Sequence, residues 1–185
     1  MAEGYEGVKF KTMFAAADFG CPRERRGIIA EIANLRKMGL IHGIPGNLSV
    51  RVPEGMVITP AGKDLAELEE SDLVLVTGVN EEAQMVKVSG RLLPSSEAFM
   101  HWLAYKARPD SCAVVHFHDD ALLESGRMPT TEESHPYGTL ELARSAAKAL
   151  KKSRFIRLKG HGFLVAGGDL KDCNAMIAKA EKAKK

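Results

Sequence analysis

The sequence is poor in cysteine, with only three, at Cys21, Cys112 and Cys173. They are odd in number and far apart, and no C-x-x-C pair occurs. This pattern argues against a disulfide framework and against a cysteine-rich zinc site, because both need closely matched cysteines. Such sparse cysteine use is typical of a reducing compartment, and we expect a cytoplasmic protein.

The chain also lacks long apolar runs and any large excess of charge. No segment approaches the roughly 18 apolar residues of a membrane span. Residues 1–20 lack the basic start and apolar centre of a secretory signal. A net charge of +2 is too small to indicate a nucleic-acid-binding surface. We therefore expect a soluble protein whose partners include neither membranes nor nucleic acids.

What remains is an ordinary globular mixture, 45% hydrophobic and 27% charged, in 185 residues. This length suits one domain over residues 1–185, and no repeat or linker interrupts it. Helical and strand patterns are interleaved, and several joins between strands are too short for parallel crossovers. The sequence therefore predicts an α/β fold with a mixed, mainly antiparallel sheet. We expect helices at 23–39, 94–108, 140–152 and from 170 onward, strands at 47–52, 56–60, 72–78, 84–90, 112–118 and within 155–167, and irregular structure at 121–137.

Capping residues stand at several expected helix starts. Ser95, Thr139 and Asp169 each carry a side-chain oxygen that can accept a backbone N–H of the first helical turn. Glu97 falls in the first turn of the expected helix over 94–108, where the helix dipole favours negative charge. We predict that all three residues act as N-caps.

A pair of histidines ends the expected strand over 112–118. His116 and His118 lie at i and i+2, so the period of two along a strand places both imidazoles on one face. A metal would need a third ligand, and His161, between two glycines at the end of another strand, is the obvious candidate. Three histidines leave an open position, as in catalytic zinc sites. The alternative is a pair of surface or hydrogen-bonded histidines, and the spacing alone leaves both interpretations open.

Glu97 is the best candidate for a side chain that moves a proton, although a carboxylate at a helix start is common for electrostatic reasons alone. His101 follows one turn later on the same helix face. It could orient Glu97 or pack in the core, and we favour packing. We interpret His42 and His135 as loop or surface groups and not as ligands.

Two glycine-containing segments, GIPGNLSVR and TPAGKD, have the composition of anion-binding loops. Their glycines allow backbone N–H groups to converge, and Asn47 and Lys63 could add donors. Each segment taken singly is an ordinary turn, and neither matches a Walker A or a dinucleotide fingerprint.

The order of these pieces along the chain resembles the class II aldolase/adducin family. The resemblance covers roughly residues 25–175 and depends on four segments: GLIHGIPGNLSVR, MVITPAG, PSSEAFMHWLAYKARPDSCAVVHFH and LKGHGFLVAGGDLKDC. It implies a three-layer α/β/α sandwich and commonly a homotetramer. It also implies a divalent metal, usually zinc, held by His116, His118 and His161, with Glu97 as the acid/base carboxylate.

The activity implied by this resemblance is that of a metal-dependent aldolase-type lyase acting on a small sugar phosphate or a related hydroxy-carbonyl compound. The family alternatives are a sugar-phosphate 4-epimerase, a dehydratase and a non-catalytic adducin-like assembly module. Retention of all three histidines and Glu97 favours an enzyme over the assembly module. The resemblance assigns substrate-phosphate binding to Gly46, Asn47, Ala61, Gly62, Ser95 and Ser96.

The sequence departs from the family pattern at several points. The first loop reads G-I-P-G-N, where Pro45 has no N–H, and Ala61 lacks the hydroxyl that aldolases carry there. Only 19 residues separate His118 from Gly138, and we expect the usual C-terminal tail to be absent. Asp120 could partner one of the imidazoles or cap the segment that follows, and both interpretations stay open.

Overall fold

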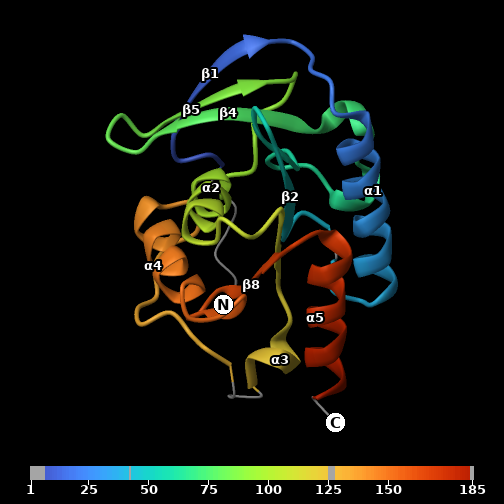
Figure 1. The fold of residues 1–185 in the computed structure, drawn as a ribbon, viewed down its shortest axis with the longest axis vertical. Coiled ribbons are helices and arrows are strands. Elements are labelled where there is room, and N and C mark those ends of the chain that lie inside the picture. The colour runs from blue at the N-terminus through green and yellow to red at the C-terminus, as the bar shows by residue number, and fades with distance from the viewer. Residues whose placement is uncertain (1–6, 42, 125–127, 184–185) are drawn as a thin grey trace.

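The computed structural model describes residues 7–41, 43–124 and 128–183. Eight strands form one sheet in the order β1-β5-β4-β3-β2-β6-β8-β7 (Figure 1). Neighbouring strands run antiparallel except for β1 and β5, which are parallel, so the predicted mixed, mainly antiparallel sheet is confirmed. The strands are β1 (Lys11–Ala16), β2 (Asn47–Val52), β3 (Gly55–Ile58), β4 (Val74–Asn80), β5 (Met85–Ser89), β6 (Ala113–Phe117), β7 (Phe155–Leu158) and β8 (Gly162–Gly167).

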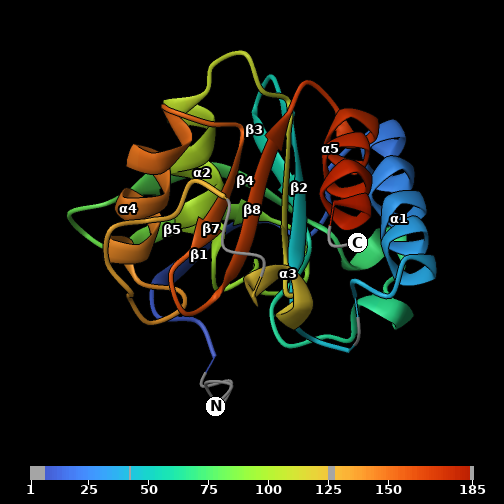
Figure 2. The same ribbon diagram turned by 90° about the horizontal axis from the view of Figure 1, so that it is seen from below.

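Helices cover both faces of the sheet. In Figure 2, α1 (Pro22–Lys37) and α5 (Leu170–Lys182) lie on one side of it, and α2 (Ala98–Ala107) and α4 (Leu140–Leu150) lie on the other. The predicted three-layer α/β/α arrangement is therefore confirmed. A short helix, α3 (Asp120–Glu124), and two 3-10 turns, η1 (Leu65–Glu67) and η2 (Glu70–Asp72), complete the elements. None of the helices in the described ranges is long and apolar enough to cross a membrane.

The alternation of side chains along the central strands divides the core into two layers. On β6, Val114 packs with the residues of α2 and α4, whereas Val115 and Phe117 pack with those of α1 and α5. Successive side chains of a strand point to opposite faces, so His116 lies on the same face as Val114, toward α2. The periodicity of this short strand therefore decides which helix layer the histidines meet.

Most expected elements appear close to their predicted positions, and the caps at Thr139 and Asp169 are confirmed. The Thr139 hydroxyl accepts the N–H of Leu142, and the Asp169 carboxylate accepts the N–H of Asp172. The cap at Ser95 is wrong, because α2 begins only at Ala98. Ser95 instead forms the preceding turn, where its hydroxyl accepts the N–H of Glu97 at 3.2 Å.

One strand and one α-helix were not expected from the sequence. β1 is an edge strand that is exposed on both faces, so its sequence, KTMFAA, shows no alternation of apolar and polar residues. α3 lies in the stretch that we expected to be irregular. Its first turn is held by Asp119, whose carboxylate accepts the N–H of Leu122 at 2.7 Å.

The cap of α5 gives a direct test of this local chemistry. We expect Asp169→Ala to lower the free energy of unfolding by about 1 kcal/mol, because the N–H of Asp172 loses its acceptor. Asp169→Ser is the matched control, since serine can also cap, and it should keep most of that stability. Urea denaturation of the three proteins measures the difference. Equal losses in both variants would contradict the capping role.

Candidate active site

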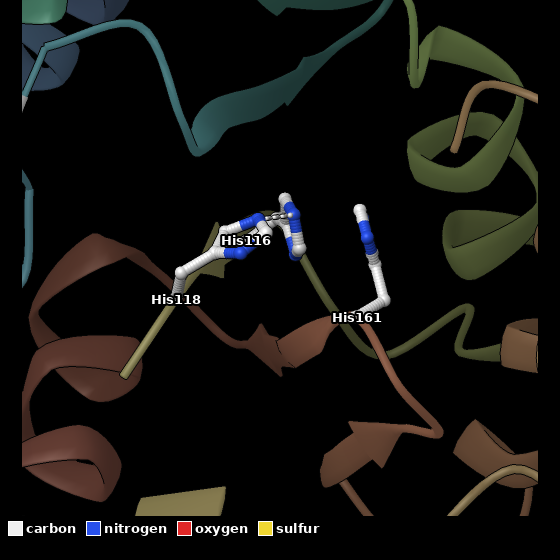
Figure 3. Close-up of side chains that lie close together, drawn as sticks. All are labelled: His116, His118 and His161. Carbon is white, nitrogen blue, oxygen red and sulfur yellow. Dashed lines mark hydrogen bonds between the residues drawn. The ribbon is translucent and has the colours of Figure 1, made fainter. Parts of the chain in front are cut away.

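The three predicted histidines meet where β6 ends and β8 begins (Figure 3). His116 lies in β6, His118 follows that strand directly, and His161 lies in the turn before β8. One ring nitrogen from each lies within 4.8 Å of the others. His116 Nε2 and His118 Nε2 are 3.0 Å apart, and the rings of His116 and His161 stack. The structure therefore brings together three residues that are up to 45 positions apart.

Two glycines leave room for His116. A Cβ atom on Gly162 would lie 2.7 Å from the Phe117 carbonyl oxygen and 3.1 Å from the His116 ring. A Cβ atom on Gly46 would lie 3.0 Å from the His116 carbonyl oxygen, and the φ of Gly46, +99°, also favours glycine. The histidine cluster can form only because the backbones of β8 and of the loop before β2 approach β6 this closely.

The hydrogen bond of His116 to the backbone determines which of its ring nitrogens carries the lone pair. Its Nδ1–H donates to the Phe163 carbonyl oxygen at 2.8 Å, so in the neutral ring the lone pair is on Nε2. That nitrogen faces His118 Nε2 at 3.0 Å and Glu97 Oε2 at 3.2 Å. A lone pair and a carboxylate thus converge at one point, which is an arrangement that a cation would stabilise. The donor set therefore fits a divalent metal.

Burial keeps the imidazoles of His116 and His118 neutral, which is the form that binds metals. Desolvation lowers the pKa of His116 to about 3, and it lowers the pKa of His118 to about 4. The nearby His161 adds to the lowering at both, while Glu97 opposes it. Both rings therefore present lone pairs at neutral pH without first having to lose a proton.

Glu97 lies beside the cluster, at the start of α2. His161 Nε2 lies 2.9 Å from its Oε1, and Asn47 Nδ2 donates to its Oε2 at 2.8 Å. Burial alone would raise the pKa of Glu97, but the hydrogen bonds of His161 and Asn47 outweigh it. The pKa therefore lies below its ordinary value, and Glu97 is a carboxylate at neutral pH.

The predicted anion-binding segments also lie together. The backbone N–H of Ala61 donates to Leu93 O, and that of Ser95 donates to Thr59 O, so these two bonds join the TPAG loop to the PSSE turn. Gly46 approaches His116, as described above, and Asn47 pairs with His116 across β2 and β6. All three segments are thus anchored beside the histidine cluster and Glu97. Their contact with a substrate phosphate stays a prediction.

His101 has a different place from the one that we favoured. It is fully buried, but it does not merely pack, because both of its ring nitrogens are hydrogen-bonded. Nε2 lies 2.6 Å from Asn47 Oδ1, and Nδ1 lies 2.7 Å from Ser49 Oγ. His101 therefore reaches Glu97 through Asn47. The spacing of Glu97 and His101 was visible in the sequence, but nothing local pointed to Asn47, 54 positions from His101.

The remaining polar residues near the site have ordinary structural roles. Asp120 is exposed in the first turn of α3, so the interpretation as a partner of an imidazole is wrong. The neighbouring Asp119 makes the capping bond instead. His135 lies 3.7 Å from Glu133 and, as we expected, does not belong to the cluster. The expectation for His42 falls outside the described residues.

Comparison with known proteins gives a consistent result. The family model "Class II Aldolase and Adducin N-terminal domain" matches residues 26–185. The L-fuculose phosphate aldolase of Escherichia coli strain K12 is 32% identical over 157 residues, which cover 75% of this chain and 70% of that protein. The 5-methylthioribulose-1-phosphate/5-deoxyribulose-1-phosphate aldolase of Rhodospirillum rubrum is 30% identical over 176 residues, with 85% and 77% covered.

Solved structures agree with this match. A structure of L-fuculose 1-phosphate aldolase superposes with a TM-score of 0.77 at 31% identity, covering 89% of this chain and 84% of that one. A sugar-phosphate aldolase from Thermotoga maritima, 19% identical, has the same fold, with a TM-score of 0.73 and 88% and 92% covered. The histidine cluster, the adjoining carboxylate and these matches lead to one conclusion: the chain belongs to the class II aldolase and adducin family.

Proposed function

We propose that this protein is a metal-dependent aldolase of sugar phosphates, that is, a lyase that cleaves or forms a carbon–carbon bond. The observation that carries the proposal is the complete cluster of His116, His118 and His161 with the ionised Glu97 in contact with it. The relatives named above, aldolases of fuculose and ribulose phosphates, support the same substrate class. A non-catalytic adducin-like module would have no need of this arrangement. Among enzymes, the nearest alternative to an aldolase is a 4-epimerase or a dehydratase of the same family.

The proposed metal ligands are His116, His118 and His161, and the proposed metal is zinc, although another divalent ion suits three imidazoles. When bound, such an ion supplies electrophilic activation of a substrate carbonyl. The protein prepares the ligands in advance, because the bond from His116 to Phe163 O fixes the tautomer and the ring orientation.

In this proposal, Glu97 moves the proton of the reaction. In the cleavage direction the carbon–carbon bond breaks, its electron pair stays with the carbon next to the carbonyl, and Glu97 returns a proton to that carbon. The hydroxyl on the other carbon gives its proton to the ionised Glu97 and becomes the aldehyde carbonyl, and this is the proton that Glu97 then delivers. Asn47 donates to Oε2 and His161 Nε2 lies 2.9 Å from Oε1, so the two contacts fix the orientation of this carboxylate.

The proposed anion end of the substrate site is formed by the three joined segments. We assign it to Gly46, Asn47, Ala61, Gly62, Ser95 and Ser96. Gly62 adopts a left-handed conformation, with φ of +68°, which is typical of loops whose N–H groups converge on an anion. The hydrogen bonds of Ala61 and Ser95 hold two of the segments against each other.

Two further proposals follow from the family and the cysteines. We propose a homo-oligomer, because tetramers are common in the family and because the edge strand β1 leaves Met13 and Phe14 exposed by 43% and 49%. We also propose a cytoplasmic location, since all three cysteines are free thiols.

The decisive experiment is an activity screen of the zinc-loaded protein. It should combine dihydroxyacetone phosphate with several small aldehydes, and it should repeat each reaction with unphosphorylated dihydroxyacetone. We expect carbon–carbon bond formation with the phosphorylated donor only. Turnover of the unphosphorylated donor alone would contradict the sugar-phosphate assignment, and no turnover of either would contradict the aldolase.

The metal site can be tested without any substrate. At free zinc about 100 times the Kd, binding should stabilise the fold by about 2.7 kcal/mol, which raises Tm by roughly 5–10 °C. His161→Ala should abolish both the bound zinc and the rise in Tm. His135→Ala, which removes a histidine outside the cluster, should keep both. A full complement of zinc in the His161 variant would remove His161 from the site.

A second substitution tests the proton-transferring role. We expect Glu97→Gln to keep the zinc and to lower kcat by about 10²- to 10⁴-fold, because an amide cannot accept the proton. Zinc content and steady-state rates of the purified variant measure the two effects separately. Unchanged kcat with the true substrate would show that Glu97 does not act as the base.

A further inference from the structure

A chain of five buried polar groups extends from Glu97 away from the histidines. It consists of Glu97, Asn47, His101, Ser49 and Tyr105, joined by hydrogen bonds of 2.6–2.9 Å. Three of the groups come from one face of α2, at i, i+4 and i+8, and two come from one face of β2, at i and i+2. Because of these two periodicities, side chains from the helix and from the strand alternate along the chain of hydrogen bonds. The chain ends at Tyr105, under the Arg51 guanidinium.

The direction of every hydrogen bond in this chain is determined. Glu97 is ionised and can only accept, so the Asn47 amide must turn its NH₂ group toward it. The carbonyl oxygen of Asn47 then faces His101, whose Nε2 must donate. Burial lowers the pKa of His101 to about 3, so the ring is neutral and its Nδ1 accepts from the Ser49 hydroxyl. The Ser49 oxygen in turn accepts from the Tyr105 hydroxyl.

This assignment leaves Asn47 with both ends of its carboxamide engaged inside the protein. If the amide were rotated by 180°, its carbonyl oxygen would lie against the Glu97 carboxylate and its NH₂ group against the His101 N–H. Both contacts would be repulsive and buried. The acceptor at Glu97 and the donor at His101 Nε2 therefore both select the observed orientation of Asn47.

We propose that His101 is a positioning residue, which holds the Asn47 carboxamide so that its N–H is directed at the Glu97 carboxylate. The role of the Asn47 carboxamide is then to orient the base, so in the proposed anion site Asn47 takes part through its backbone and not through its side chain. This inference rests on the proposed function of Glu97, but the hydrogen bonds themselves do not depend on it. The His101 ring must be neutral for this pattern, because Nε2 donates to Asn47 while Nδ1 accepts from Ser49.

The kinetic test compares two substitutions of His101 in the zinc-loaded protein. We expect His101→Leu to lower kcat by about 10- to 100-fold, with KM and zinc content unchanged. His101→Gln keeps an N–H donor for Asn47 and should retain most of kcat. Leu142→Ala, a core substitution in α4 outside the chain of hydrogen bonds, controls for lost stability and should keep kcat. A loss in His101→Leu no larger than that in Leu142→Ala would overturn the proposal.

A second variant separates the two roles of Asn47. If Asn47 orients Glu97, Asn47→Ala lowers kcat, while inorganic phosphate inhibits the variant and the wild type at the same concentration. If Asn47 binds the substrate phosphate instead, the variant keeps kcat, raises KM, and loses inhibition by inorganic phosphate. The second result would overturn the proposal.

A third measurement needs no activity. In the metal-free protein, NMR should detect His101 as the neutral tautomer with the proton on Nε2, and it should detect Asn47 side-chain N–H groups that are protected from solvent exchange. His101→Leu should remove this protection, and Leu142→Ala should keep it. Unchanged protection in His101→Leu would overturn the proposal, whatever the activity. An inactive wild type with this NMR result would instead contradict only the aldolase function.

Discussion

The carboxylate of Glu97 is 4% exposed, and a buried ion without partners is expensive in a protein interior. Polar groups on two sides of the carboxylate offset this free-energy cost. On one side, His161 Nε2 lies 2.9 Å from Oε1, and on the other side Asn47 donates to Oε2 from β2. Substitution of either partner would leave one oxygen of a buried charge without its contact. The geometry of the site therefore follows from the need to satisfy this one group.

The sheet provides the frame that makes those contacts possible. Asn47 and His116 are directly paired in the register of β2 and β6, so a donor to Glu97 and a histidine of the cluster start from neighbouring backbones. The backbone of Gly162 lies close to β6, and this brings the adjacent His161 to His116 and Glu97. Because β6 is buried on both faces, its register cannot slip by one residue without turning His116 away from α2. The stability of the core and the precision of the site thus have a common origin.

The site also contains two kinds of side chain with opposite requirements, neutral histidines and an ionised glutamate. The histidines need lone pairs and therefore low pKa values, which burial supplies. Glu97 needs to stay ionised in the same dry environment, which only hydrogen-bond donors can supply. The neutral His101 connects these demands, because it directs a donor at the carboxylate without placing a positive charge beside the histidine cluster.

Local chemistry predicted part of this structure correctly. Thr139 and Asp169 cap their helices because a capping side chain needs only the N–H groups of the next turn. Ser95 failed as a cap because its loop is held by the TPAG segment, 36 positions earlier at Thr59, so α2 starts late. β1 was missed because an edge strand that is exposed on both faces has no apolar alternation to reveal it.

For the site, the sequence by itself determined that two imidazoles share one face of a strand and that a carboxylate stands at the start of the helix that precedes this strand. Those statements depend only on the periods of two and 3.6 residues. The sequence offered His161 as a candidate third ligand, but only the tertiary structure decided that it reaches the cluster and that Asn47 turns its amide toward Glu97. These contacts join groups 64 and 50 positions apart, and their geometry depends on strand register and on the packing of α2 against β2. No local pattern in the chain encodes either.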